Sequence, residues 1–451
     1  MKIIRDNIWA PNGMNSTSSV QWSYWNDIIP FGNEYICFNT LSGAVAVLKS
    51  QEYSLYHKQP SSAPDSLTKS GIIVSGQKKE KDEWLQQYIK GKNDESILDL
   101  TIVSTMQCQF KCVYCFEGDK GKQVLTNHTI EHIKKLVENR KKHLKILRIT
   151  WFGGEPLLNM TAILKLSAFF IDFCSQNGIK YIADITTNGY VLSSSLCNTL
   201  VNECNIRRYI ITIDGTPEMH NRRRPLQNGK GTFDRIWGNI QNLIKLEGTS
   251  VTIRITIDRE NANHMREFID LLAKSPLANK VGLAFSKTID YSFTPHYIHN
   301  KILTFEEFTK LEIELIRYAH SKGILQFTTP RPCPSGGCLR KGDIVIGAYG
   351  EIYKCLDTIG EKNWISGNIS DGNTNIPDWY NDWLSWNPLE DDLCKNCKLL
   401  PLCNGGCPHN AIFSSKKHGA EDQCPDWKLN YIQRIILYVE EKLNTHEYQE
   451  I

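Results

Sequence analysis

The run Cys108-Gln-Phe-Lys-Cys112-Val-Tyr-Cys115 supplies three thiols in CxxxCxxC spacing and no fourth. Iron–sulfur cubes are held by Cys thiolates, normally four of them. Three cysteines in one loop therefore leave one iron of a cube without a protein ligand, and that iron can hold a reacting molecule. The alternative is a zinc knuckle, which needs four ligands and usually sets one CxxC pair against another. The rest of the chain decides between the two.

The composition is ordinary for a soluble globular protein. The chain has 451 residues, 41% of them hydrophobic and 22% charged, which is enough for two or three domains. The formal net charge of +3 is too small to indicate a nucleic acid or a membrane as partner. The first residues lack the apolar segment of a secretory signal, and no apolar run long enough to span a bilayer is expected. The sequence therefore predicts a cytoplasmic protein.

The fifteen cysteines are grouped rather than spread along the chain. In a chain without an export signal, grouped cysteines indicate metal sites rather than disulfides. Four of them stand apart, in apolar or helical surroundings, and are expected to be core thiols. The other eleven form three groups, which are Cys108, Cys112 and Cys115, then Cys333, Cys338 and Cys355, then Cys394, Cys397, Cys403, Cys407 and Cys424.

From residue 97 onward, apolar strand candidates alternate with helical patterns. Six such pairs predict an α/β fold with a parallel sheet and right-handed crossovers. Six strands are too few for a closed eight-stranded barrel, and the carboxyl ends of the strands should carry the chemistry. The expected strands are Leu98–Val103, Ile146–Phe152, Tyr181–Thr187, Arg208–Ile213, Val251–Ile257 and Val281–Phe285, and the expected helices cover about 127–143, 160–176, 193–203, 232–246, 263–274 and 304–321.

The cluster loop, with Tyr114 before its last cysteine and Phe116 after it, resembles that of the radical S-adenosylmethionine (radical SAM) enzymes. One βα unit later comes Trp151-Phe-Gly-Gly-Glu-Pro156, which is similar to the GGEP motif of the same enzymes. On its own, this motif could be only a tight turn. The resemblance implies a partial (βα)6 TIM-like barrel and a [4Fe-4S] cluster at the three loop cysteines, with SAM chelated to the open iron.

Further positions follow the family's pattern for cofactor contacts. Thr212-Ile-Asp-Gly215, His220-Asn-Arg-Arg-Arg224 and Gly229-Lys-Gly-Thr-Phe-Asp234 look like the corresponding stretch of peptide- and sulfatase-maturing members. Arg224 falls where a carboxylate-binding arginine sits, although its two neighbouring arginines are also candidates, and Asn221 replaces the usual acid. The alternative is a charged surface loop. The resemblance implies cofactor contacts from Tyr114, Gly153, Gly154, Glu155, Asn188, Thr212 and Arg224.

The C-terminal cysteines resemble the SPASM pattern, which marks auxiliary-cluster domains in radical SAM maturases. With Cys333 there are eight of them, enough for two fully ligated cubes and three [4Fe-4S] clusters in the whole chain. If Cys333 does not ligate, its cluster has an open iron for substrate. A zinc ribbon remains the alternative for the CxxC pair alone. The resemblance implies Cys333, Cys338, Cys355 and Cys407 at a first auxiliary cluster, and Cys394, Cys397, Cys403 and Cys424 at a second.

These patterns divide the chain into four segments. Residues 1–95 are expected to form a small α+β domain, with a hairpin at Glu34–Asn39 and Ala44–Leu48 and a helix at Lys79–Lys90. This domain resembles, loosely, the winged-helix domains that grip a leader peptide and can add it as an extra strand. A packing extension of the barrel is the alternative. The radical SAM barrel is expected over 96–325, the SPASM domain over 326–426 and a last helix in 427–451.

The resemblance implies an enzyme that cleaves SAM reductively to a 5′-deoxyadenosyl radical, which takes a hydrogen from a C–H bond. The leading hypothesis is a maturase that installs a C–C, C–S or C–O crosslink, or another oxidative modification, in a ribosomally synthesised precursor peptide. Flavodoxin or ferredoxin would be its electron donor.

Two other functions are the alternatives. In anaerobic sulfatase-maturating (formylglycine-generating) enzymes an Asp directly follows the cysteine at the position of Cys355. Here Leu356 stands there and Asp357, the candidate general base, comes one residue later. A multi-cluster electron carrier, the non-enzyme alternative, gives no reason for the Gly-Gly-Glu-Pro motif.

Overall fold

The computed structural model describes residues 1–6, 19–76, 79–115, 121–290, 296–324, 327–332, 337–371, 376–413 and 423–450. The chain forms two compact units. The smaller contains Met1–Asn93, Phe327–Arg340 and Asp382–Ile451, and the larger contains Asp94–Gln326 and Lys341–Asn381. The last helix and most of the C-terminal cysteines therefore belong to the same unit as the N-terminal strands, whereas the sequence division keeps them in separate segments.

The larger unit is built on a nine-stranded sheet of order β12-β11-β10-β9-β8-β7-β13-β14-β15. Strands β7 to β12 are parallel and adjacent in chain order, which confirms the predicted α/β fold. Each begins and ends within two residues of its predicted bounds. These strands are β7 (Ile97–Thr105), β8 (Ile146–Gly153), β9 (Lys180–Thr187), β10 (Ile206–Thr212), β11 (Ser250–Ile257) and β12 (Val281–Lys287).

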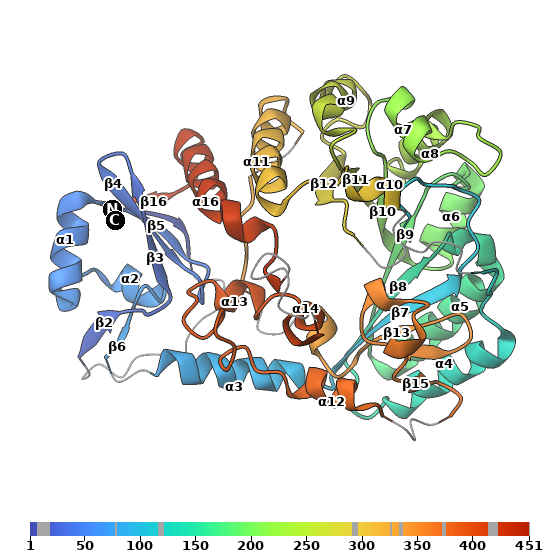
Figure 1. Cartoon of the computed structure of the whole chain (residues 1–451). Helices are drawn as coiled ribbons and strands as arrows, with labels where there is room; N and C mark the ends of the chain where they lie inside the picture. Colours follow the sequence, from blue (N-terminus) through green and yellow to red (C-terminus); the bar gives the residue numbers. More distant parts are fainter. Residues whose placement is uncertain are drawn as a thin grey trace. The chain divides into compact units, whose positions relative to one another are not determined.

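Helices follow the strands and cover the outer side of the curved sheet, as Figure 1 shows for α4, α5 and α6. Their apolar side chains recur at helical spacing, as at Ile130, Ile133 and Val137, so each buries one face against the strands. The helices are α4 (Asn127–Asn139), α5 (Met160–Asn177), α6 (Ser194–Asn202), α7 (Pro217–Arg223), α8 (Phe233–Leu243), α9 (Met265–Ala273), α10 (His296–His299) and α11 (Phe305–Ser321), with 3-10 turns η2 (Pro156–Asn159), η3 (Ala262–His264), η5 (Leu356–Thr358) and η6 (Lys362–Trp364). Helix α12 (Asp378–Ser385) crosses from one unit to the other.

The sheet continues past β7 in a way that the sequence did not predict. Strand β13 (Asp343–Ile346) pairs with β7 in parallel, and β14 (Glu351–Tyr353) and β15 (Gly367–Asn368) follow in antiparallel order. These strands have two to four residues, too few to show a period-2 pattern. Cys355 lies between β14 and β15, two residues after the end of β14.

The smaller unit contains a five-stranded antiparallel sheet of order β16-β1-β5-β4-β3. The predicted hairpin is present as β4 and β5. The apolar face of the sheet packs against α16, the predicted last helix, through Ile435 and Val439. The strands are β1 (Lys2–Arg5), β3 (Asn26–Phe31), β4 (Glu34–Asn39), β5 (Val45–Lys49) and β16 (Gln449–Glu450), with β2 (Val20–Trp22) paired to β6 (Ile73–Ser75) beside them in the unit. The helices are α1 (Ser50–Lys58), η1 (Pro60–Ser62), α2 (Asp65–Lys69), α3 (Glu80–Lys92), η4 (Gly337–Leu339), α13 (Leu400–Cys403), α14 (Pro408–Phe413) and α16 (Trp427–Asn444).

One segment is more apolar than the sequence analysis expected. The stretch Pro156–Asn177, which includes α5, is long and apolar enough to cross a membrane, with a mean hydropathy of 1.6. Its inward side chains, among them Leu166 and Phe170, are fully buried in the core of the larger unit. The apolar character of α5 is therefore explained by its packing as a core helix.

Candidate active site

The cluster loop follows β7 and is held on one side by the segment after α7. Lys111 N donates to Pro225 O at 2.8 Å, and Phe110 and Leu226 form an antiparallel bridge. The Gln227 side chain donates to the backbone oxygen of Cys108 at 2.7 Å. Backbone groups that would otherwise be unpaired at the base of the loop thus have partners.

The Gly-Gly-Glu-Pro loop after β8 holds the other side. Gly154 N donates to Thr105 O at 3.0 Å, and Glu155 N donates to Gln107 O at 2.8 Å. A Cβ on Gly153, whose φ is +129°, would lie 2.1 Å from Thr105 O. No side chain fits between the two loops, so glycine is required there. The motif is therefore more than a turn, because it packs against the chain that leads into the cluster loop.

The Glu155 carboxylate is fully buried and accepts three hydrogen bonds. The donors are Thr187 Oγ1 at 2.7 Å, Asn188 N at 2.7 Å and Leu157 N at 3.0 Å. Burial raises the pKa of Glu155, and these donors oppose the rise. The carboxylate ties the loop after β8 to the end of β9. Its expected contact with a cofactor stays a prediction.

Glu155→Gln is expected to destabilise the larger unit. Either orientation of the amide places its NH2 group against a buried backbone N–H, that of Leu157 or that of Asn188, so at least one hydrogen bond is replaced by a repulsive contact. The expected cost is about 1–3 kcal/mol, or a fall in Tm of roughly 2–12 °C. Calorimetry checks this against Glu131→Gln, an exposed carboxylate paired with Lys134, for which the Tm should not move. Equal Tm values for the two variants would contradict the bracing role.

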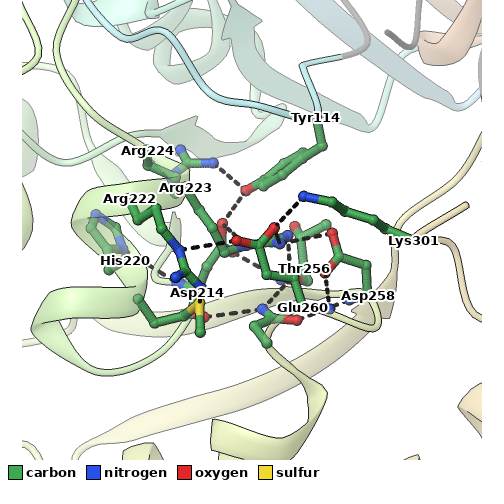
Figure 2. A network of polar contacts seen from close by, with 12 residues as sticks. Tyr114, Asp214, His220, Arg222, Arg223, Arg224, Thr256, Asp258, Glu260 and Lys301 are labelled. Carbon is green, nitrogen blue, oxygen red and sulfur yellow. Dashed lines mark hydrogen bonds and ion pairs between the residues drawn. The ribbon is translucent and has the colours of Figure 1, made fainter. Parts of the chain in front are cut away.

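Tyr114 belongs to a polar network in the larger unit (Figure 2). Its hydroxyl donates to Asp214 Oδ2 at 2.5 Å and accepts from Arg224 Nη1 at 2.6 Å. The guanidinium groups of Arg223 and Arg224 lie 5.0 and 5.9 Å from the centre of its ring. The aromatic residue of the cluster loop is thereby fixed by both of the arginines.

Arg223 is fully buried among carboxylates. Arg223 Nη1 donates to Asp258 Oδ2 at 2.7 Å, and its Nε lies 3.6 Å from Asp214 Oδ2. Glu260 lies at 3.8 Å and is paired in turn with Lys301 at 2.8 Å. Burial alone would lower the pKa of Arg223, but these anions raise it overall. Arg223 is thus a structural cation, which leaves Arg224 as the arginine at the cluster loop.

Arg224 is also buried, and its charge is stabilised by the cluster loop. Burial would lower the pKa of Arg224, but Cys112, Tyr114 and Asp214 raise it well above its ordinary value. Its Nε has no hydrogen-bond partner among the described residues. Gln109 Oε1 is likewise buried and unpaired within the described chain. Two unsatisfied polar atoms beside the cluster loop fit the binding of a polar ligand there.

Asn188 connects the end of β9 to the same place. Its Nδ2 donates to Cys108 Sγ at 3.8 Å, and its Oδ1 accepts from Gln109 Nε2 at 3.4 Å. Thr212 is the last residue of β10, one strand further along the sheet. Of the predicted contact residues, Tyr114 lies in the cluster loop, Asn188 directly follows β9, and Arg224 follows α7 and reaches the loop through its hydrogen bond to Tyr114. The donor set fits a molecule that carries both a carboxylate and hydroxyl groups, as SAM does.

The three thiols of the loop lie within electrostatic range of one another. Burial raises the pKa of Cys112 to about 12, Arg224 opposes the rise, and Cys115 and Cys108 add to it. Burial also raises the pKa of Cys108 to about 11. Across the described residues, no three Cys, His, Asp or Glu side chains converge as the ligands of one ion would. A cube takes each cysteine on a separate iron, so three loop thiols would leave its fourth iron without a protein ligand.

The imidazole of His220 is neutral and carries its hydrogen on Nε2. Its Nδ1 accepts from Asp214 N at 3.3 Å. Its Nε2 lies 3.0 Å from Thr232 Oγ1, whose single proton is donated to Arg224 O at 2.8 Å, so Nε2 must carry the hydrogen. Burial, Arg224 and Arg223 hold the pKa of His220 well below its usual value. His220 thus connects the end of β10 to the start of α8.

Asn221, which replaces the acid usual at this position, has a structural role. Its Oδ1 accepts from Thr232 N at 2.7 Å and from Phe233 N at 2.9 Å. These are donors of the first turn of α8, so the amide caps that helix from outside it. An amide does this as an acid would, and the substitution is accommodated.

The neutral state of His220 predicts a dependence of stability on pH. Its folded pKa lies below that of the unfolded chain, about 6.5, so below pH 6.5 only the unfolded state takes up a proton and stability falls. Between pH 7.5 and 5.5 the loss is about 1.4 kcal/mol. His220→Gln lowers stability at every pH but removes this slope. Tm values of both proteins across that range check it, and parallel curves would contradict it.

The smaller unit contains all four predicted ligands of the second auxiliary cluster, Cys394, Cys397, Cys403 and Cys424. Burial raises the pKa of Cys403 to about 11, with Cys397 and Cys424 raising it further. Burial also raises the pKa of Cys394, and Asp391, Cys403 and Cys424 add to the rise. The four thiols therefore face a common region, and the loop that carries them is tight. A Cβ on Gly406 would lie 2.0 Å from Gln423 O.

The remaining predicted ligands are divided between the two units. Cys333 lies outside the described residues. Cys338 and Cys407 belong to the smaller unit and Cys355 to the larger. Asp357, the candidate base, lies on the exposed turn η5. The first auxiliary cluster and the role of Asp357 therefore stay predictions.

Several residues in or against the cluster loop were not predicted from the sequence. Gln109 and Gln227 are ordinary loop residues in sequence, and neither carried a signal. Tyr297 OH donates to Val113 O at 2.9 Å from α10, far along the chain. Arg223 was named only as an alternative to Arg224, because three consecutive arginines do not reveal which of them is buried.

The comparisons with known proteins agree with this geometry. Residues 102–272 match the model of the radical SAM superfamily. The chain is 25% identical over 343 residues to a cysteine-type anaerobic sulfatase-maturating enzyme of Clostridium novyi, covering 68% of this chain and 86% of that enzyme. The superfamily model and this relative together indicate that the chain is an enzyme of the kind that modifies proteins or peptides.

Two solved structures share the fold. The anSMEcpe structure with bound AdoMet and Kp18Cys peptide is 19% identical, with a TM-score of 0.58, over 78% of this chain and 99% of that one. Streptococcus suis SuiB bound to its precursor peptide SuiA is 15% identical, with a TM-score of 0.51, over 86% of this chain and 95% of that one. At these identities the likeness shows the fold, including the predicted partial barrel.

Proposed function

The chain is a radical SAM enzyme of the SPASM maturase type, and from this premise we propose that it installs a crosslink in a ribosomally synthesised precursor peptide. Its radical SAM domain implies SAM and one [4Fe-4S] cluster as cofactors. The observation that carries the proposal is the cluster loop itself. It is held between the Gly-Gly-Glu-Pro loop and the segment after α7, and Arg224 donates a hydrogen bond to its Tyr114.

The residues of the larger unit would hold the cofactors. Cys108, Cys112 and Cys115 would each bind one iron, and Arg224 would pair with the SAM carboxylate. Asn188 and Thr212, at the ends of β9 and β10, would meet its hydroxyl groups. When bound, the cluster and SAM supply a 5′-deoxyadenosyl radical that can take a hydrogen from a C–H bond. The buried Arg223 and the three carboxylates around it would hold Tyr114 and Arg224 in place.

Two auxiliary clusters complete the proposal. Cys394, Cys397, Cys403 and Cys424 would hold one, in the region of the smaller unit that their thiols share. Cys333, Cys338, Cys355 and Cys407 would hold the other. Flavodoxin or ferredoxin would supply electrons, and Asp357 is the candidate base for the substrate.

A peptide partner is supported by the sheet of the smaller unit. Strand β3 is an edge strand, which pairs only with β4 within the described sheet. An extended peptide can add to such an edge by main-chain hydrogen bonds. A precursor peptide is also bound by SuiB in its solved structure. We infer that a leader peptide binds the N-terminal strands.

Maturation of a sulfatase is the second candidate function, favoured by the identity with the Clostridium novyi enzyme. Co-expression followed by mass spectrometry separates the two. The partners are a short peptide encoded beside this gene and a sulfatase-derived peptide with a Cys or Ser at its modified position. Crosslinking is expected to remove two hydrogens from the encoded peptide and to leave the sulfatase peptide unchanged. An aldehyde on the sulfatase peptide, with no change in the other, would contradict the proposal.

A further inference from the structure

A lysine lies against one of the four cysteines in the smaller unit. Lys428 is in the first turn of α16, and Cys424 comes just before this helix. Lys428 Nζ donates to Cys424 Sγ at 3.1 Å. Besides this bond, Lys428 interacts electrostatically with Cys397, Cys424 and Cys403. The ammonium therefore faces the region that the four thiols share.

A second side-chain donor to these thiols is neutral. Gln423 Nε2 donates to Cys394 Sγ at 3.4 Å and to Gly405 O at 3.2 Å. Lys395, next to Cys394 in sequence, points elsewhere, because its ammonium pairs with Asp392. Of these three side chains, Lys428 alone brings a positive charge to a thiol. The positive charge thus lies beside Cys424, one of the four proposed ligands.

We propose that Lys428 is a positioning residue for the second auxiliary cluster, donating a hydrogen bond to the Cys424 ligand and raising the reduction potential of that cluster. The proposal rests on the proposed function, since it requires a cluster at Cys394, Cys397, Cys403 and Cys424. Lys428 acts through Cys424 and does not touch the reacting atoms.

The physical reason is the change of charge on reduction. A cluster that takes up one electron becomes more negative by one unit, and the electron comes from an added chemical reductant in the test below. A lysine ammonium, charged at neutral pH, stabilises the more negative state more strongly. Hydrogen bonds to the sulfurs and net charge are among the factors that set the potentials of these clusters. The cluster with Lys428 should accordingly accept an electron more readily.

The test is an anaerobic redox titration of the reconstituted full-length protein with dithionite, followed by electron paramagnetic resonance. The signal of the second cluster is identified as the one that Cys394→Ala removes. Lys428→Met is expected to lower the ratio of reduced to oxidised cluster about tenfold at the wild-type midpoint. For a one-electron couple this equals a shift of about 59 mV to lower potential. Lys428→Arg keeps the positive charge, so its midpoint potential should lie close to that of the wild type.

Two further variants make the result decisive. Lys395→Met removes the same charge one residue from Cys394 and should leave the midpoint in place. Lys428→Gln keeps a donor without the charge, and its midpoint gives the answer if Lys428→Met takes up less iron. An unchanged midpoint in Lys428→Gln and Lys428→Met, or an equal shift in Lys395→Met, would overturn the role of Lys428 and leave the cluster itself standing. A wild-type protein with no signal that depends on Cys394 would instead overturn the proposed second cluster, and Lys428's role with it.

Discussion

Arg223→Met is expected to lower the free energy of unfolding of the larger unit by about 3–5 kcal/mol, or its Tm by roughly 6–20 °C. The substitution removes the only guanidinium that reaches both Asp214 and Asp258 in the described network, and both carboxylates are fully buried. Asp258 would lose the guanidinium to which it is hydrogen-bonded, and Asp214 would lose one of its two neighbouring arginines. Scanning calorimetry of the purified protein measures the shift.

Arg222 provides the matched control. It stands one residue earlier, pairs with Glu260 at 3.0 Å, and its side chain is 55% exposed. An exposed ion pair contributes little to stability, so Arg222→Met should move the Tm by no more than about 2 °C. If both variants shift the Tm equally, the network in Figure 2 is a solvated surface feature and the position of Tyr114 does not depend on Arg223.

Gly153→Ala is expected to reduce SAM cleavage about a hundredfold, because the added Cβ would lie 2.1 Å from Thr105 O and must displace the chain that leads into the cluster loop. A displacement of about 1 Å near a reacting group can cost a rate of this size. The positive φ of Gly153 adds strain to any side chain there. Single-turnover release of 5′-deoxyadenosine measures the effect, with iron content determined on the same sample.

Gly178→Ala separates the close approach from the backbone strain. Gly178 ends α5 with a φ of +64°, and beyond its own chain neighbours no atom lies within 4 Å of the point that an added Cβ would occupy. The alanine there is expected to cost stability but to leave SAM cleavage within about twofold of wild type. A hundredfold loss in both variants would mean that strain, and not the contact with Thr105, is responsible.

Much of the larger unit could be predicted because its signals are local. Parallel strands buried on both faces appear as apolar runs, and β7 to β12 were found within two residues of their ends. β13 to β15 were missed, because short edge strands carry no pattern and β13 depends on β7, more than 200 residues away. The same holds for β1 and β16, which pair the two ends of the described chain.

The residues of the site likewise differ in whether the sequence could predict them. The cluster loop and the Gly-Gly-Glu-Pro motif are contiguous, so sequence shows them. The buried role of Arg223 depends on Asp258 and Glu260 from the loop after β11, and that of Lys428 depends on the fold of the cysteine-rich loop. Such contacts join residues whose sequence neighbours give no indication of burial. Glu155 was expected at the cofactor, and only the structure shows that its oxygens accept from Thr187 and Asn188.

The most direct measurement is the yield of 5′-deoxyadenosine from SAM, with the anaerobically reconstituted and reduced protein, for wild type and Cys112→Ala. The wild-type protein is expected to contain iron and sulfide and to release 5′-deoxyadenosine, and the variant is expected to release none above background. Undiminished release by Cys112→Ala, or zinc in place of iron and sulfide in the wild-type protein, would contradict the assignment of this loop.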